Sequence, residues 1–282
     1  RGAGISWSGQ GAFDKAEDAF LTALDFTDKS EENLRTDLNF YLADAQYHQK
    51  EYRACIKTCD EILDEKKEKN GYFLRGSAYL HLDEYKKAEK DFSKVISGSK
   101  EYEDYLDIYR IYRECDLNAD GAEYLETALE LKAKSPEDFY NRGRVYYYLS
   151  EFEKAEKELK TAWEKEYAPA AIYLGKVYVE AKEPEKAEAM YQKCLKQEEL
   201  KAYNGLAYCS MELEDYEKAL EYIQKGLKVN DKEVNQALLF NEIVIYEKNQ
   251  DFASAKEKMQ QYLTLYPADD TAVKENYFLQ TR

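Results

Sequence analysis

Three basic side chains recur at nearly equal intervals in a chain that is otherwise strongly acidic. Arg110, Arg144 and Lys176 are separated by 34 and 32 residues, although the formal net charge of the 282-residue chain is −16. Guanidinium and ammonium groups form charge-assisted hydrogen bonds with carboxylates. If the fold repeats with this period and aligns the three residues, they predict a site for an acidic ligand.

No other residue pattern points to chemistry. The sequence has no P-loop, G-x-G-x-x-G, G-x-S-x-G or H-E-x-x-H motif, and its two histidines, His48 and His81, stand apart from other metal-ligating residues. There are five cysteines and no C-x-x-C, and the spacing of Cys55 and Cys59 puts both on one face of a helix, as small core residues. We therefore predict a protein that is not an enzyme and has no cofactor and no metal.

Composition narrows the class of partner. The sequence pI is about 4.8, whereas nucleic-acid binding normally depends on basic patches that displace counterions from phosphate. No apolar run approaches the roughly 18 residues that a membrane span needs. We expect a protein or peptide partner, no nucleic acid, and no direct insertion of this segment into a membrane.

Internal repetition supplies the elements that must position the basic row. The phrase "RGSAYLHLDEYKKAEKDF" at 75–92 returns as "RGRVYYYLSEFEKAEKEL" at 142–159. A small anchor residue recurs at spacings of 39, 33, 33, 34, 32, 32 and 36 residues, as Ala16, Cys55, Ala88, Gly121, Ala155, Ala187, Ala219 and Ala255. Twelve residues earlier lies a second column, usually small, which includes Gly4, Ala43, Gly76, Gly143, Gly175 and Ala207. Four residues after most anchors stands a bulky residue such as Phe20, Phe92, Leu159, Tyr191 or Ile223. Apolar spacings of three and four on both sides of a short polar break predict two amphipathic helices per repeat.

The repeat resembles the tetratricopeptide repeat, whose pattern the fifth copy carries as Phe139, Gly143, Tyr146, Ala155, Leu159 and Ala162. The resemblance implies an all-α, right-handed superhelical solenoid of about eight helical hairpins, forming a single array over residues 1–282. The expected repeats cover residues 1–30, 36–67, 69–99, 102–133, 136–166, 168–199, 200–232 and 236–267, and a capping helix covers 268–282. The fourth repeat departs from the pattern with Tyr109 in the small column and Gly121 as anchor, and the eighth departs with Ile243 in the small column. We expect altered packing at these places.

The resemblance also implies a concave groove lined by the first helix of each hairpin. Tyrosine offers a broad, rigid contact surface with a polar tip, and asparagine pairs with a peptide group as both donor and acceptor. On this basis the candidate binding residues are Arg110, Arg113, Tyr140, Asn141, Arg144, Tyr147, Tyr148, Tyr173, Lys176, Asn204, Tyr208 and Asn241. We expect them to bind a segment of another protein through acidic side chains or a C-terminal carboxylate. The alternative is that the bases only neutralise nearby acids, namely Asp107, Glu103 and Glu180.

A non-enzymatic interaction scaffold is the first functional hypothesis. The alternatives are the peptide-sensing part of a larger regulator, and a receptor for a small molecule or glycan that uses the tyrosine-rich wall. The wording of the first repeat resembles tetratricopeptide lipoproteins of Gram-positive bacteria, which implies a bacterial cell envelope location, with the cytoplasm as the alternative. That repeat begins partway through its first helix, which predicts that a preceding segment was removed.

Overall fold

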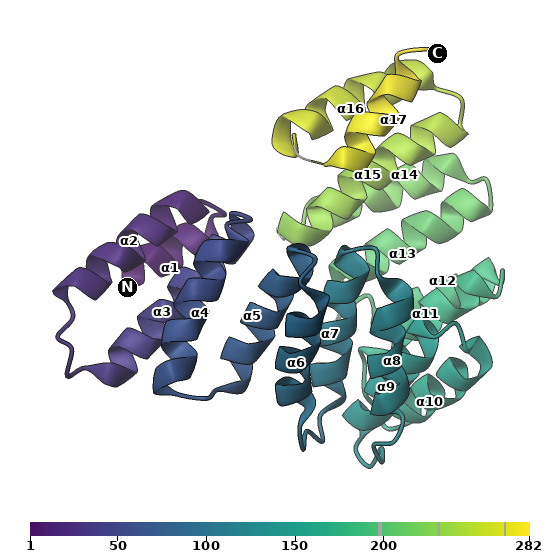
Figure 1. The fold of residues 1–282 in the computed structure, drawn as a ribbon. Coiled ribbons are helices and arrows are strands. Elements are labelled where there is room, and N and C mark those ends of the chain that lie inside the picture. Colours follow the sequence, from purple (N-terminus) through teal and green to yellow (C-terminus); the bar gives the residue numbers. More distant parts are fainter. Residues whose placement is uncertain (197–198, 230–231, 268) are drawn as a thin grey trace. The chain divides into compact units, whose positions relative to one another are not determined.

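The computed structural model describes residues 1–196, 199–229, 232–267 and 269–282. Within these ranges the chain forms seventeen α-helices and no β-strand (Figure 1), which confirms the prediction of an all-α helical repeat solenoid. In chain order the helices are α1 (Gly2–Gly9), α2 (Phe13–Phe26), α3 (Glu32–His48), α4 (Tyr52–Glu65), α5 (Lys69–His81), α6 (Tyr85–Ile96), α7 (Tyr102–Glu114), α8 (Asn118–Ala128), α9 (Pro136–Tyr148), α10 (Phe152–Glu164), α11 (Ala170–Glu180), α12 (Pro184–Cys194), α13 (Glu199–Glu212), α14 (Tyr216–Gly226), α15 (Lys232–Lys248), α16 (Phe252–Leu265) and α17 (Asp270–Leu279). Residues 197–198 and 230–231, inside the predicted sixth and seventh repeats, and residue 268, the predicted start of the capping helix, lie outside the described residues.

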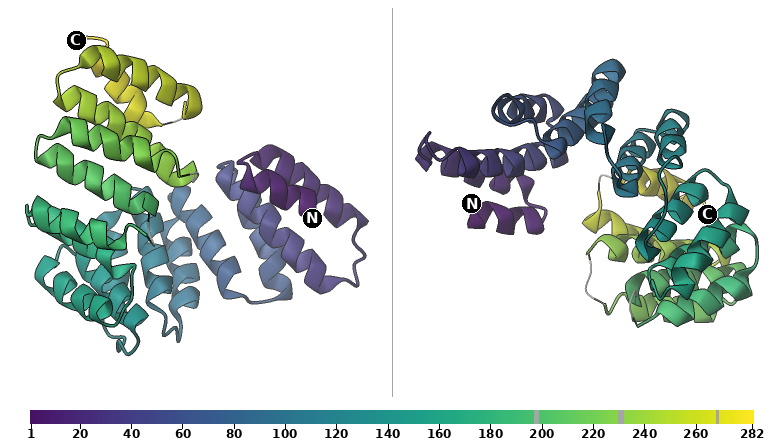
Figure 2. Two further views of the ribbon diagram at one scale, coloured as in Figure 1. Left: turned by 180° about the vertical axis from the view of Figure 1, so that it is seen from behind. Right: turned by 90° about the horizontal axis from the view of Figure 1, so that it is seen from below.

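The helices pair as successive antiparallel hairpins, from α1 with α2 to α15 with α16, and α17 packs on α16. They form two compact units, an N-terminal unit of residues 1–131 and a C-terminal unit of residues 132–282. Figure 2 shows, from two further sides, how consecutive hairpins lie beside one another within each unit. That the two units make a single array stays a prediction.

The same turn closes all eight hairpins. Three residues separate the two helices each time, and the middle residue has a positive φ, from 58° at Lys182 to 75° at Gly11. Two backbone hydrogen bonds fix the turn. In the fifth hairpin, Ser150 N–H donates to Tyr147 O at 3.0 Å and Glu151 N–H donates to Tyr146 O at 2.9 Å. This left-handed residue satisfies the last carbonyl groups of the first helix and reverses the chain.

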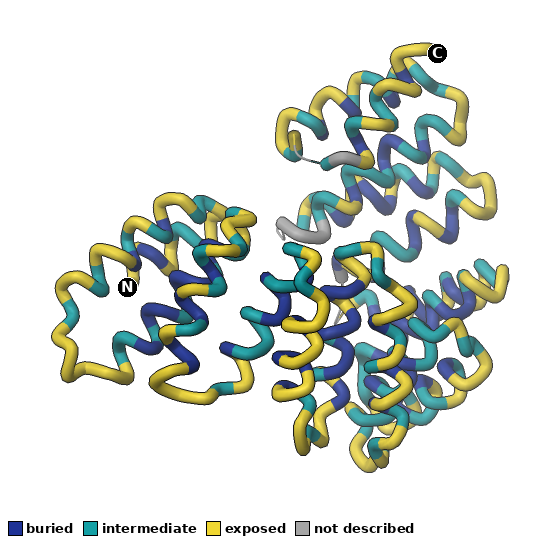
Figure 3. Tube along the Cα trace, in the orientation of Figure 1, coloured by how far each residue is buried: buried dark blue, intermediate teal, exposed yellow. Residues whose placement is uncertain are grey.

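Within a hairpin, the small column packs directly on the bulky residue that follows the anchor. A methyl group built at Gly76 would lie 2.9 Å from Cε1 of Phe92, and one built at Gly175 would lie 2.5 Å from Cε1 and Cζ of Tyr191. Such contacts leave no space for a larger side chain. The eight anchors and Cys59 are all buried, as predicted for core residues. Figure 3 shows buried positions recurring at short intervals along most helices.

The fourth hairpin keeps the same packing with the sizes exchanged. Tyr109 is buried in the small column, and the anchor on the facing helix is Gly121. A methyl group built at Gly121 would lie 3.1 Å from Cδ2 of Tyr109 and 2.7 Å from Cβ of Tyr112. The predicted change in packing is therefore a compensated exchange of volume. In the eighth hairpin, Ile243 and Met259 are both fully buried.

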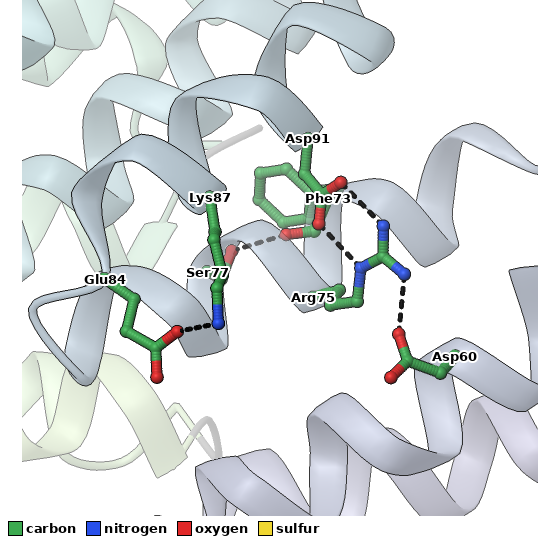
Figure 4. A network of polar contacts seen from close by, with 7 residues as sticks. All are labelled: Asp60, Phe73, Arg75, Ser77, Glu84, Lys87 and Asp91. Atoms are coloured by element: carbon green, nitrogen blue, oxygen red, sulfur yellow. Dashed lines mark hydrogen bonds and ion pairs between the residues drawn. The ribbon is translucent and has the colours of Figure 1, made fainter.

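Arg75 joins two hairpins of the N-terminal unit (Figure 4). Its Nε and Nη2 donate to the two carboxylate oxygens of Asp91 on α6, at 2.7 and 2.8 Å. Its Nη1 donates to Oδ1 of Asp60 on α4, in the preceding hairpin, at 2.6 Å. Hydrogen bonds from the guanidinium to Asp91, joined by those to Asp60, raise the pKa of Arg75. Because Asp91 is only 3% exposed, the Arg75–Asp91 pair is a buried connection within the third hairpin. The Asp60 side chain, which links Arg75 to the preceding hairpin, is 50% exposed.

Two other hairpins use the same pair of positions for an ion pair. In the fifth hairpin, Nη2 of Arg142 lies 2.6 Å from Oε2 of Glu158. In the eighth hairpin the signs are exchanged, and Nζ of Lys258 lies 2.9 Å from Oε1 of the buried Glu242. These charges hold the two helices of a hairpin together, so they belong to the packing of the repeat.

Candidate functional site

The predicted binding residues of the C-terminal unit lie on the first helices of its four hairpins. Neighbouring first helices pack side by side, α9 on α11, α11 on α13 and α13 on α15. The 32-residue spacing puts Arg144, Lys176 and Tyr208 at the same place, one residue after the small column. The wall carries Tyr140, Asn141, Arg144, Tyr147 and Tyr148 on α9, Tyr173 and Lys176 on α11, Asn204 and Tyr208 on α13, and Asn241 on α15.

Arg144 is held by aromatic rings from two helices. Its Cζ lies 5.3 Å from the ring centroid of Tyr140 on α9 and 5.6 Å from that of Tyr173 on α11. Its Nη1 donates to Oδ1 of Asn141, one turn earlier, at 2.9 Å. Cation–π contacts of this kind are worth about 0.5–2 kcal/mol, depending on how far the cation is desolvated. They orient the guanidinium in the free protein, which lowers the entropy that binding would cost.

Tyr173 supports a second cation. Nζ of Lys176 lies 4.5 Å from the ring centroid of Tyr173, so the two bases of the wall share one aromatic ring. Tyr173 is only 8% exposed, and its hydroxyl is hydrogen-bonded to the hydroxyl of Tyr148 at 2.9 Å. Tyr173 therefore positions Arg144 and Lys176 and presents little surface of its own.

Tyr147 completes the aromatic cluster. Its ring centroid lies 5.5 Å from that of Tyr148 and 5.6 Å from that of Tyr173, both in edge-to-face arrangements, which favour aromatic contact. Its hydroxyl donates to Oε1 of Glu180 at 3.4 Å. Burial, with a smaller contribution from the charge of Glu180, raises the pKa of Tyr147. The phenol is therefore a hydrogen-bond donor and not an anion beside the two bases.

The predicted amides also come together. Nδ2 of Asn241 on α15 donates to Oδ1 of Asn204 on α13 at 2.6 Å. Tyr208, on the same helix as Asn204, is 38% exposed, and burial raises the pKa of its phenol with a smaller contribution from Glu212. The structure thus groups the candidate residues of this unit into a cationic aromatic cluster and an adjoining amide pair.

Arg110 and Arg113 lie elsewhere, on α7 of the N-terminal unit. Arg110 is exposed, and its Nη2 lies 2.8 Å from Oδ1 of Asp107 on the same helix. This contact is the one that the alternative interpretation expects, but whether Arg110 only neutralises Asp107 stays a prediction. A continuous basic row through Arg110, Arg144 and Lys176 stays a prediction.

One contributor to the cluster was missed by the sequence analysis. The ring of Tyr167 packs on that of Tyr140, with 5.1 Å between centroids. Tyr167 lies in the connection between α10 and α11, outside both helices of a hairpin. A search along helix positions cannot find it, and its aromatic character was the only available signal.

His81 has close neighbours, contrary to the expectation that it stands apart. Its Nε2 is 2.9 Å from the hydroxyl of Tyr47, its Nδ1 is 3.5 Å from Sγ of Cys115, and its ring stacks on Tyr52. Burial lowers the pKa of His81, while burial and the charge of Glu114 raise the pKa of the Cys115 thiol to about 11. A protonated thiol is a poor nucleophile, so this cluster does not resemble an activated cysteine site.

The described parts of the chain contain no cluster of three or more His, Cys, Asp or Glu side chains arranged to hold a metal ion. None of their helices combines the length and the apolar character needed to cross a membrane.

Stacked helical hairpins with a repeated three-residue turn define a helical repeat protein. Tetratricopeptide repeat models match residues 140–204, 174–233 and 211–270, and a second model of the same repeat matches residues 70–98. Together these matches cover more than half of the sequence, and the chain belongs to the tetratricopeptide repeat family. No curated protein matches the sequence significantly.

Solved structures with the same fold share little sequence with the chain. A tetratricopeptide repeat protein from Parabacteroides merdae aligns over 99% of this chain and 96% of its own, with TM-score 0.57 and 15% identity. Yeast Tom70 aligns over 91% of this chain and 57% of its own, with TM-score 0.62 and 16% identity. The APC/C hetero-tetramer Cut9-Hcn1 aligns over 95% of this chain and 52% of its own, with TM-score 0.51 and 14% identity. This chain thus spans just over half the length of the last two, and the likeness concerns the fold alone.

Proposed function

We propose that the chain is a non-enzymatic scaffold that binds a segment of another protein through its acidic side chains or C-terminal carboxylate. The single observation that carries the proposal is the pair of cations, Arg144 and Lys176, resting on the ring of Tyr173. Helical repeat proteins characteristically bind partners on extended surfaces built from successive repeats. The first helices α9, α11, α13 and α15 form such a surface in the C-terminal unit.

The geometry favours a carboxylate over other ligands. A guanidinium that rests on aromatic faces makes its hydrogen bonds in its own plane, and two neighbouring N–H groups of that plane match the two oxygens of a carboxylate. Arg144 rests on two rings, and Lys176 follows at the same place in the next hairpin. Two such cations, one repeat apart, suit a peptide with an acidic side chain and a second negative charge further along.

The adjoining amides suit the backbone of the same peptide. Asn204 and Asn241 lie on the next two first helices and are hydrogen-bonded to each other. An asparagine side chain can donate to a peptide carbonyl and accept from a peptide N–H. A glycan or small-molecule receptor is less favoured, because Tyr173 is buried and its hydroxyl is already bonded to Tyr148.

Charge reversal tests this proposal. We expect Arg144→Glu combined with Lys176→Glu to weaken the binding of an Asp/Glu-rich peptide by about tenfold or more, since charge-assisted hydrogen bonds are worth about 1.5–3 kcal/mol each. Fluorescence anisotropy with labelled peptide would measure the change. A peptide with a C-terminal amide, compared with the free acid, separates recognition of the terminal carboxylate from recognition of acidic side chains.

A matched control has the same charge change away from the wall. Lys157 on α10 and Lys193 on α12 are exposed and lie on second helices, so Lys157→Glu with Lys193→Glu should leave peptide affinity within about twofold, as expected for remote, screened charges. Equal weakening by both double variants would mean that only net charge matters and would refute the site. Adding Arg110→Glu to the first variant tests whether the basic row extends into the N-terminal unit.

A further inference from the structure

A lysine-lined cavity of about 430 Å³ lies in the N-terminal unit, far along the sequence from the wall described above. Its lining includes Lys67 before α5, Lys69 at the start of α5, Lys94 in the last turn of α6, and Lys100 in the connection to α7. We call it the lysine pocket. Four lysines of one unit therefore line a single hollow.

The lysine pocket is positively charged, whereas the chain as a whole is negatively charged. Lys69 is bonded to Oδ1 of Asp104 at 2.7 Å. Among the described residues, no ion pair joins Lys67, Lys94 or Lys100 to an acidic side chain. This is unexpected in a chain with 57 acidic and 41 basic residues. Glu101 and Asp104 also line the pocket, so four lysines against two carboxylates leave it a net charge of +2, which favours a bound anion.

Other groups of the pocket add hydrogen bonding and apolar surface. Oγ of Ser99 accepts from Glu101 N–H at 3.1 Å and donates to Asp104 Oδ2 at 2.5 Å, which fixes the connection between α6 and α7. Tyr72 and Val95 also line the hollow and give its mostly polar lining a small apolar part.

The basic lining residues suit a phosphate. All four are lysines, and lysine binds phosphate as a compact point charge. The cavity volume of about 430 Å³ is larger than a single phosphate group fills, since one water occupies about 30 Å³ in the liquid. The remaining space can hold an organic group, and Tyr72 is the aromatic residue of the lining.

We propose that the lysine pocket binds a small phosphorylated compound, with its phosphate among Lys67, Lys94 and Lys100 and its organic part against Tyr72. This site is separate from the peptide-binding wall in sequence and in ligand chemistry. Its test therefore does not depend on the outcome of the peptide experiment.

Isothermal titration calorimetry at fixed ionic strength tests the proposal with inorganic phosphate, pyrophosphate and phenyl phosphate as probes. We expect Lys94→Gln combined with Lys100→Gln to weaken the binding of phenyl phosphate about tenfold, because each exposed charge contributes modestly and the two act together. The control is Lys86→Gln with Lys90→Gln, two exposed lysines of α6 that do not line the pocket. It should change the affinity less than about twofold, as expected for screened charges outside the site.

Four results would overturn the proposal in whole or in part. Equal weakening in both double variants would show nonspecific attraction to positive charge. The absence of binding by any of the three probes to the unmodified chain would remove the site. Equal affinity for inorganic phosphate and phenyl phosphate would overturn the role of Tyr72. If the chain instead bound an Asp/Glu-rich peptide and none of the three phosphates, and if Lys94→Gln with Lys100→Gln abolished that binding, the pocket would be a protein-binding surface.

Discussion

Gly175→Ala offers a sharp test of how the hairpins pack, because two physical effects oppose each other there. Gly175 lies within α11, where alanine is favoured over glycine by about 0.5–1 kcal/mol. A methyl group at this position would, however, lie 2.5 Å from two ring atoms of Tyr191. Ordinary carbon–carbon contacts are about 3.5–4.0 Å, so either the ring or the helices must move.

The ring of Tyr191 is also confined on the side of the next hairpin. A methyl group built at Gly205, on the next first helix, would also lie 2.5 Å from Cζ of Tyr191. Tyr191 is therefore wedged between glycines of two hairpins. Overpacking a core by this amount typically costs about 1–3 kcal/mol. After subtraction of the gain in helix propensity, we expect Gly175→Ala to lower the free energy of unfolding by about 1–2 kcal/mol.

Urea titration followed by far-ultraviolet circular dichroism measures this change as a lower midpoint at unchanged slope. Gly9→Ala in α1 is the control, because a methyl group there has no neighbour within 4 Å, and we expect no loss of stability. Adding Tyr191→Ile recreates the pair that the seventh hairpin already has, Ala207 with Ile223, so the alanine should then cost less. An increase in stability for Gly175→Ala, as large as that for Gly9→Ala, would refute the packing argument.

Two further predictions concern buried carboxyl groups. Asp91→Ala should lower the free energy of unfolding by about 3 kcal/mol, because it removes two hydrogen bonds from the partly buried Arg75. Asp60→Ala, at a side chain that is 50% exposed, should cost less than about 1 kcal/mol. Equal losses for the two variants in urea titrations would contradict this prediction. Burial and the nearby Glu275 raise the pKa of Glu247 to about 7. Between the ordinary glutamate pKa and pH 7, the folded chain therefore holds a proton there that the unfolded chain releases. The contribution of Glu247 to stability should be full below the ordinary glutamate pKa and should fall as the pH rises towards 7. Glu247→Gln should raise the melting temperature near pH 8 more than near pH 5, and an equal change at both pH values would show that Glu247 does not titrate in this way.

The repeat and its packing columns could be predicted because they rest on residue volume, which a single sequence displays. The pairing of Gly76 with Phe92 follows from spacing alone, since small and large residues recur at fixed distances from the anchor. The fourth hairpin was harder to interpret. Tyr109 and Gly121 each break a column, and only the structure shows that one departure makes room for the other. Reading the two columns as a pair would have predicted that exchange.

The left-handed turn between the two helices of each hairpin could not be predicted from residue types. The left-handed position is filled by Lys50, Asp83, Ser150 and Glu214 among others, with glycine only in the first hairpin. Most of these residues do not favour a positive φ. The conformation is fixed by two backbone hydrogen bonds at the end of each first helix, and these depend on where the helix stops and not on the side chain.

The residues of the candidate site could be predicted from the sequence, but the contacts between their side chains could not. The repeat period placed Arg144 and Lys176 at equivalent positions. That both cations rest on Tyr173 depends on the ring of one helix reaching back towards its neighbour, and such contacts follow from side-chain direction. The same limit applies to His81, whose contacts with Tyr47 and Cys115 join residues that are each 34 positions away.

One pair of facing positions shows how the residues of a hairpin can vary while its two helices stay packed. The first position lies just before the small column, and the second lies three residues after the anchor. That slot holds an arginine–carboxylate pair, the reverse pair or two apolar side chains, namely Arg75 with Asp91, Glu242 with Lys258, and Leu174 with Met190. Each choice satisfies the slot, since a buried position needs matched volume and matched charge but no particular residue. One residue after the small column, that requirement ends. Arg144, Lys176 and Tyr208 stand there and differ in size and charge. Arg144 and Lys176 contact the rings of Tyr140 and Tyr173 on the first helices, so the residues proposed to bind a partner belong to a column that varies between repeats.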